Sequence, residues 1–228
     1  MSKSKSITSF VQSAELPAHL LNANSGLGNE NVNSGDLQMS RLDLIQQLSP
    51  QFEKGNPAYL EGADLGHMFD SATGDLYESV FMVNLYFDKR FQVFKKRKFG
   101  GGFEGSHQTE EAARATLEDQ SLPVDQYDIV ETDIHACLML DAEGRPKKPC
   151  VIYMSGSKAK ISRKWNTALQ TQEADRFASV WALTSVKEKN KQGQPYQNFD
   201  VKFAGWGSAD LYEEAKKNYL SFRGQKEQ

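Results

Sequence analysis

The stretch FDKRFQVFKKRKFGGGFEG, residues 87–105, places cationic and aromatic side chains side by side in a pattern that could bind a polyanion. Single-stranded nucleic acid is held in this way, because Lys and Arg contact phosphates while each exposed ring stacks on a base for roughly 1–3 kcal/mol. Strand alternation directs Phe94 outward, and the glycine run exposes the rings that flank it. The stretch therefore predicts a DNA-binding surface made of Lys89, Arg90, Phe94, Lys95, Lys96, Arg97, Lys98, Phe99 and Phe103.

A second group of the same composition follows later in the chain. It consists of Lys158, Lys160, Arg163 and Lys164, with Trp165 beside them. Trp165 shares a helical stripe with Ile161 and Leu169, so the pattern allows either a core position or a platform for base stacking. We include all five residues in the predicted DNA-binding set. The alternative for both groups is a solvated charged face.

The glycines of the first stretch also match a nucleotide-binding signature. Gly100, Gly102 and Gly105 fit G-x-G-x-x-G, but that motif requires a buried parallel strand before it and a βαβ unit around it. The preceding residues are basic and alternate in polarity, which favours a turn whose glycines adopt positive φ. Such a turn would also let a nucleic-acid strand approach the backbone.

The best candidate for catalysis is a set of charged residues in the C-terminal part of the chain. Glu188, Asp200 and Lys202 could hold Mg²⁺ and position a water in a nuclease. Alternating charges on the outer face of a strand explain them equally well, since Phe199, Val201 and Phe203 would then face inward. The four histidines are scattered, and the sequence contains no Cys-x-x-Cys motif or Walker loop. We therefore expect no catalytic residues, no metal and no cofactor.

Composition limits the kind of nucleic-acid site that the chain could carry. The 228 residues include 27 Lys and Arg against 30 Asp and Glu, a formal net charge of −3, so a DNA site must be a local patch. The two cysteines, Cys137 and Cys150, lie in apolar runs and resemble buried hydrophobic residues of a reducing compartment. No apolar run is long enough to span a bilayer. A soluble protein of the cytoplasm, without membrane contact, is expected.

Period-two and helical patterns predict the elements that position these residues. Residues 1–36 form a polar, mobile leader, and residues 37–228 form one domain. We expect a short helix over residues 40–48, strands over 127–140 and 150–154, and a hairpin pairing 177–186 with 197–204. For residues 81–95 the pattern allows either one long bent strand or two strands joined by a three-residue turn. Helices follow Thr109 and cover residues 158–170 and 211–222. The predicted class is mainly β with peripheral helices (α+β), arranged as an OB-like antiparallel β-barrel.

Several segments resemble a known family. GNENVNSGDLQMSRLDLIQQLSP, FGGGFEGS, KISRKWNTALQTQ, RFASVWALTSVKEKNKQGQPYQNFDVKFAGW and DLYEEAKKNYLSF are similar to a family encoded by tailed bacteriophages, some members of which are taken for single-stranded DNA-binding proteins. KWNTA, residues 164–168, resembles a segment of the T7-type phage single-stranded DNA-binding protein, which has an OB fold. Proteins of that function commonly end in an acidic tail that recruits replication partners. This chain ends in RGQKEQ, so the resemblance does not extend to recruitment by the tail.

Together, these observations predict a sequence-nonspecific single-stranded DNA-binding protein that supports phage DNA replication or recombination in the host cytoplasm and performs no chemistry. Phage replication proteins are candidate partners, and the oligomeric state is open. Two alternatives come from other classes: the Mg²⁺-dependent nuclease, and an interaction protein that contacts a host factor or a virion component through its aromatic residues.

Overall fold

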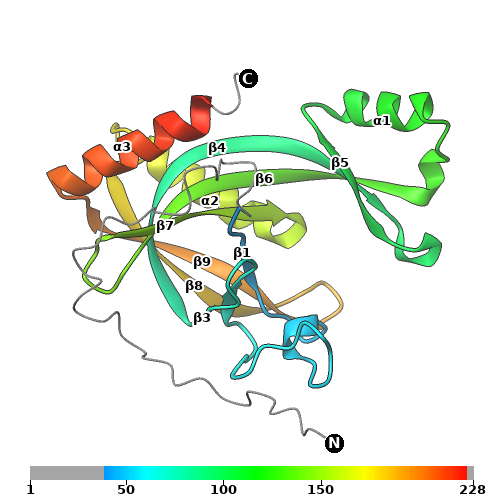
Figure 1. Cartoon of the computed structure of the whole chain (residues 1–228), viewed down its shortest axis with the longest axis horizontal. Helices are drawn as coiled ribbons and strands as arrows, with labels where there is room; N and C mark the ends of the chain where they lie inside the picture. Colours follow the sequence, from blue (N-terminus) through cyan, green and yellow to red (C-terminus); the bar gives the residue numbers. More distant parts are fainter. Residues whose placement is uncertain (1–38, 225–228) are drawn as a thin grey trace, which may run out of the picture. The chain divides into compact units, whose positions relative to one another are not determined.

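A computed structural model describes residues 39–224, which form one compact unit (Figure 1). The leader predicted for residues 1–36 lies outside the described residues. The strands are β1 (Leu42–Leu44), β2 (Met68–Asp70), β3 (Leu76–Tyr77), β4 (Ser79–Lys95), β5 (Gly102–His107), β6 (Tyr127–Leu140), β7 (Pro146–Ser155), β8 (Ser179–Lys189) and β9 (Pro195–Trp206). The α-helices are α1 (Glu110–Asp119), α2 (Ala159–Gln170) and α3 (Ala209–Gly224), and short 3-10 turns include η4 (Arg97–Phe99) and η6 (Gly156–Lys158).

The strands form two antiparallel sheets. The small sheet has the order β1-β2-β3, and the large sheet has the order β7-β6-β4-β8-β9, with β5 paired to β4 outside that path. The mainly β class with helices at its periphery is therefore confirmed, as are the predicted hairpin and the helices that begin after Thr109, near residue 158 and before residue 211. Among the described residues, no helix has the length and apolar character to cross a membrane.

Strand β4 organises the large sheet because it is long enough to pair with three other strands. It pairs with β6 along most of its length, with β8 through its first residues and with β5 through its last (Figure 1). A bulge between Asn84 and Tyr86 shifts the alternation. Strict period-two alternation over residues 81–95 would place Asn84 outside and Phe81 in the core, but Asn84 is fully buried and Phe81 is 47% exposed. Beyond the bulge the predicted phase holds, and Val93 is buried.

Strand β6 is buried on both faces in its second half. Cys137 and Met139 belong to the central core, while Leu138 and Leu140 pack in the cluster that α3 covers. Period-two alternation over residues 127–140 would put His135 on a polar outer face, but His135 is completely buried. Alternation identifies an exposed face only when one side of a strand faces solvent, and this part of β6 is covered on both sides.

The large sheet is open within the described residues, with β7 and β9 at the ends of its path. The residues that flank β1 bond to both: the Val151 amide donates to the Ser40 carbonyl at 2.8 Å, and Gln46 and Gln197 exchange two hydrogen bonds of 2.8 and 2.9 Å. The short helix predicted over residues 40–48 is therefore wrong, since backbone pairing with neighbouring strands outweighs the local helical pattern. The predicted closed OB-like barrel is not confirmed, because β7 and β9 do not pair with each other.

Candidate nucleic-acid interface

The basic and aromatic stretch lies on an arm made by the second half of β4, η4, β5, α1 and the first half of β6. The arm turns at Gly100, Gly101 and Gly102, whose φ angles of +111°, +70° and +127° are disfavoured for residues with a Cβ atom. The strand before these glycines runs antiparallel to its neighbours, so a dinucleotide-binding βαβ unit is absent at this place. The interpretation of the glycines as a turn is confirmed.

Helix α1 stabilises the arm. The Thr109 hydroxyl accepts a hydrogen bond from the Ala112 amide at 3.1 Å, which caps the helix as predicted. On its buried side, Ala113 and Leu117 pack with Val93 and Tyr127 in a separate apolar cluster. The arm thus has its own small core.

The predicted cations of the arm fall into two groups. Three are neutralised: Lys89 Nζ lies 2.6 Å from Glu131, Arg90 Nε lies 2.7 Å from Asp88, and Lys96 Nζ donates to the Asp125 carbonyl at 2.7 Å with Asp128 at 3.8 Å. The hydrogen bond to Glu131 raises the pKa of Lys89. Within residues 39–224, the other three cations of the arm have no carboxylate at ion-pair distance: Lys95, Arg97 and Lys98.

The predicted aromatic residues of the arm are accessible to different degrees. Phe103 is 58% exposed and its ring lies 5.6 Å from that of Phe94, which is half-buried. Phe99 is 36% exposed, with Lys98 Nζ 4.8 Å above its ring. Cations beside accessible rings can contact phosphates and bases of one strand together.

The second predicted group lies on and before α2, and most of its cations are paired. Lys158 Nζ lies 2.6 Å from Asp43, Lys160 Nζ 2.7 Å from Glu188, and Lys164 Nζ 3.6 Å from Asp200. Arg163 is exposed and has no carboxylate at ion-pair distance in the described part of the chain. It acts electrostatically on Lys89, opposing the rise in pKa of that lysine. The two predicted groups therefore approach each other at Arg163 and Lys89.

Trp165 belongs to the core. It is 1% exposed, and its ring stacks on His135 at 4.8 Å and contacts Trp181 edge-on at 6.1 Å. The proposed role of Trp165 in base stacking is therefore wrong, because no face of the ring is accessible to a base. The stripe shared with Ile161 and Leu169 was the correct signal, since both of these residues are also buried.

The β8–β9 hairpin carries lysines that the sequence analysis did not select. Lys189 and Lys191, together with Lys158, line a hollow of about 560 Å³ beside Gln46 and Tyr196. Among the described residues, neither Lys189 nor Lys191 has a carboxylate at ion-pair distance. The signal was present in the sequence as lysines at alternate positions, 187, 189 and 191, at the end of a predicted strand.

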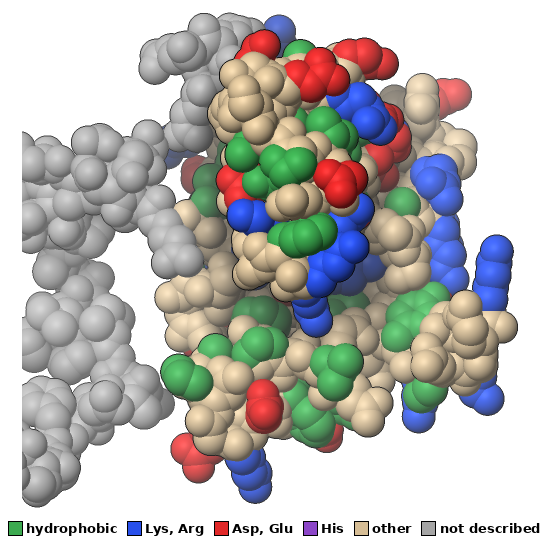
Figure 2. Space-filling model, turned by 90° about the vertical axis from the view of Figure 1, so that its right-hand side faces the viewer, with side chains coloured by type: hydrophobic (Ala, Val, Ile, Leu, Met, Phe, Trp, Pro, Cys, Tyr) green, Lys and Arg blue, Asp and Glu red, His purple; other side chains and the backbone are tan. Residues whose placement is uncertain are grey.

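The arm and the β8–β9 hairpin project from the same end of the large sheet (Figure 1). Figure 2 looks at this end and shows a hollow between an upper and a lower part, with Lys and Arg side chains at its upper rim. The arm and the hairpin, whose cations are about 90 residues apart in sequence, thus lie at the same end of the sheet.

The carboxylates proposed for a nuclease are not arranged as metal ligands. Glu188 accepts hydrogen bonds from Lys160 at 2.7 Å, Tyr196 at 2.5 Å and Asn198 at 3.0 Å, which together lower the pKa of Glu188 to about 2. Asp200 lies between Lys164 at 3.6 Å and Lys202 at 3.2 Å. No group of three or more His, Cys, Asp or Glu side chains able to hold a metal ion occurs among residues 39–224.

These features define a mainly β protein with a basic, partly aromatic recess at one end of an open antiparallel sheet. The chain belongs to the Pam3 phage gp34-like protein family, whose model matches residues 10–228. This match confirms the predicted relation to a bacteriophage protein family. No curated protein and no solved structure matches the chain, so the resemblance to the T7-type protein stays a prediction.

Proposed function

We propose that the protein binds single-stranded DNA without sequence preference and acts in phage DNA replication or recombination in the host cytoplasm. The observation that carries this proposal is the order of the elements in the large sheet together with the position of the unpaired cations.

The order of the elements supports the proposal, because it resembles that of an OB fold without the last strand pairing. In an OB fold, a long first strand pairs with both the second and the fourth, and a helix often follows the third. Here β4 pairs with β6 and β8, and α2 connects β7 to β8. Strand β1 contacts β7 and β9, where the pairing of strands three and five would close a barrel.

OB folds bind oligonucleotides with the loops between strands one and two and between strands four and five. The corresponding segments here are the connection from β4 to β6 and the β8–β9 loop. These segments carry Arg97, Lys98, Phe103 and Lys191, and Lys95 and Lys189 lie at their borders. The correspondence supports placing the DNA strand in the recess of Figure 2.

The mechanism requires no chemical step. Cations contact phosphates and rings stack on any base, so affinity depends on salt and little on sequence. Because the protein binds the unpaired strand, mass action shifts hairpins and duplex ends towards the open form. Replication proteins of the phage are the expected partners.

The decisive experiment compares two triple variants that remove the same charge. Lys95, Arg97 and Lys98 are changed to Gln on the arm, and Arg145, Lys147 and Lys217 are changed to Gln on the β6–β7 hairpin and α3. Oligo-dT affinity is measured by fluorescence at two salt concentrations. The arm variant should bind weakly. Its slope of log affinity against log salt should be less steep than that of the wild type by up to about 2, or roughly 0.7 for each lost phosphate contact. The control variant should keep the slope of the wild type.

Equal affinities of the two variants would contradict the proposal, as would a wild-type protein that fails to bind oligo-dT at low salt. The latter result would favour the interaction protein. Cleavage of DNA by purified protein on addition of Mg²⁺ would favour the nuclease.

A further inference from the structure

Arg176 lies in the segment between α2 and β8, and its positive charge is not neutralised by a carboxylate within the described residues. Its Nε donates to Asn84 Oδ1 at 2.9 Å, and a second nitrogen donates to Asn166 Oδ1. Both acceptors are neutral amides. The guanidinium group also lies 5.5 Å from the centre of the Phe87 ring.

This environment is costly for a cation unless an anion can reach it. The side chain is partly buried, and this burial lowers the pKa of Arg176. By contrast, the partly buried Arg90 has Asp88 at 2.7 Å. A guanidinium group has more N–H donors than the two amide acceptors can use, so it retains donors for a further partner.

Two hollows open on Arg176. One, of about 510 Å³, lies between β4 and α3, and the other, of about 370 Å³, lies beside the end of α2. Both are lined by Phe87 and Arg176, so the Arg176 side chain borders each of them. A volume of this size suits a small-molecule ligand such as a mononucleotide.

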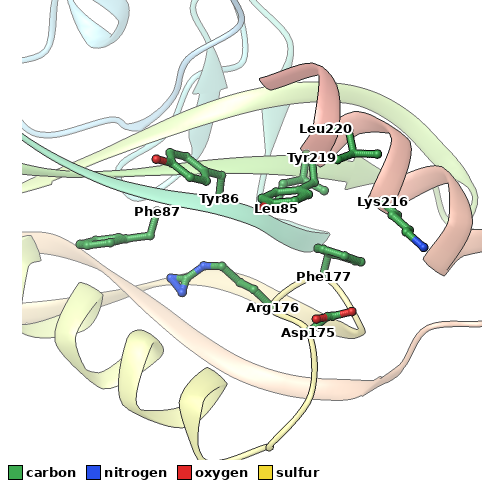
Figure 3. A pocket seen from close by; sticks show the side chains of 9 residues that line it. All are labelled: Leu85, Tyr86, Phe87, Asp175, Arg176, Phe177, Lys216, Tyr219 and Leu220. Atoms are coloured by element: carbon green, nitrogen blue, oxygen red, sulfur yellow. The ribbon is translucent and has the colours of Figure 1, made fainter. Parts of the chain in front are cut away.

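The larger hollow combines positive charge with aromatic walls (Figure 3). Arg176 and Phe87 lie at one end and Lys216, on α3, at the other, with Phe177 and Tyr219 between them. The rings of Phe177 and Tyr219 are 5.4 Å apart. The carboxylate that lines the hollow, that of Asp175, accepts a hydrogen bond of 2.5 Å from the Tyr212 hydroxyl.

We propose that this hollow binds a nucleotide through its phosphate group, with Arg176 contacting the phosphate and the aromatic wall contacting the base. Arginine is well suited to phosphate because its planar fork donates two parallel hydrogen bonds. The phosphate can belong to a free nucleotide or to the 5′ end of a DNA strand. The proposal does not rest on the single-stranded DNA function, since the arm and the hollow use different residues.

The test measures binding to the full-length protein by calorimetry in phosphate-free buffer. The ligands are dTMP, deoxythymidine, inorganic phosphate, and oligo-dT with and without a 5′-phosphate. dTMP should bind and deoxythymidine should not, and Arg176→Gln should weaken dTMP binding roughly tenfold or more, as expected for a lost charge-assisted hydrogen bond. Tighter binding of the 5′-phosphorylated oligonucleotide would identify the strand terminus as the source; preference for dTMP alone would identify a free nucleotide.

A second pair of variants keeps the test decisive if Arg176→Gln destabilises the fold. Lys216→Gln should weaken dTMP binding about threefold at low salt, because a screened charge near the ligand is lost, whereas Lys217→Gln, its neighbour outside the hollow, should have no effect. Equal binding of dTMP and deoxythymidine, binding of neither, or binding of inorganic phosphate alone would overturn the proposal. The arm variant should bind dTMP normally, so failure of the DNA-binding function and failure of this site give different results.

Discussion

Lowering the pH from 8 to 5 should destabilise the protein through one buried side chain, His135. Its Nδ1 lies 3.0 Å from Asn84 Nδ2, and its Nε2 lies 2.8 Å from the Ser162 hydroxyl. Asn84 must present its amide nitrogen to the histidine, because its oxygen accepts a hydrogen bond from Arg176. Protonation of Nδ1 would therefore place two donors face to face in a core that excludes water.

The magnitude follows from the difference in pKa between the folded and unfolded chain. Burial, with a smaller contribution from the Arg176 charge, lowers the pKa of His135 from 6.5 to about 3. The unfolded state binds the proton more tightly, so the stabilisation is complete above pH 6.5 and is lost as the pH falls towards 3. The free energy of unfolding should drop by about 2 kcal/mol between pH 8 and 5, and by roughly 4 kcal/mol at pH 3, from this group alone.

Urea unfolding at pH 8 and pH 5 measures this effect. His135→Gln should be less stable than the wild type at pH 8, but its free energy of unfolding should fall by about 2 kcal/mol less between the two pH values. His107→Gln, in β5, serves as the control and should keep the wild-type dependence. Identical pH dependence in the wild type and His135→Gln, or an NMR titration of His135 near pH 6.5, would refute the reasoning.

Three further outcomes are expected. Phe103→Ala should lower oligo-dT affinity by roughly 1–3 kcal/mol with little change in melting temperature. Phe199→Ala, at a fully buried position, should instead cost about 3–5 kcal/mol of stability and leave the affinity of the folded protein unchanged. A large drop in the melting temperature of Phe103→Ala would contradict this assignment. Glu188→Gln should lose less stability than the wild type as the pH falls from 4.5 towards 2, because the stabilising ionised form of Glu188 is present above that range. DNA should stay intact with Mg²⁺ in both proteins, and cleavage by the wild type alone would favour the nuclease. Acrylamide should quench Trp206, which is 59% exposed, and not Trp165, so Trp206→Phe should remove most of the quenchable emission.

Much of the secondary structure could be predicted because it depends on local patterns. Alternation located β6, β8 and β9 and assigned Phe199, Val201 and Phe203 to the inner face of β9, where the first two are buried but Phe203 is 48% exposed. The spacing of Thr109, Glu110 and Glu111 located the start of α1. The prediction failed at Asn84 and over residues 40–48, where a bulge and pairing with distant strands replace the local preference.

The candidate site could be predicted only in part, because composition shows which residues are cationic and not which of them are neutralised. Lys160 and Glu188 are 28 residues apart and Lys89 and Glu131 are 42 apart, and both pairs exist because separate elements bring them together. The lysines of the β8–β9 hairpin could not be assigned to the site from the sequence, because only the fold brings this hairpin to the same end of the sheet as the arm.

The sequence by itself determined the class of fold, the helices α1, α2 and α3, the family to which the chain belongs and the presence of a basic, aromatic segment, since these depend on residue type and periodicity along the chain. Tertiary structure alone decided that His135 is buried, that the sheet stays open beside β1, and that Arg176 keeps an uncompensated charge among the described residues. Burial and ion pairing depend on distances between side chains from different elements, and these distances exist only in the folded chain.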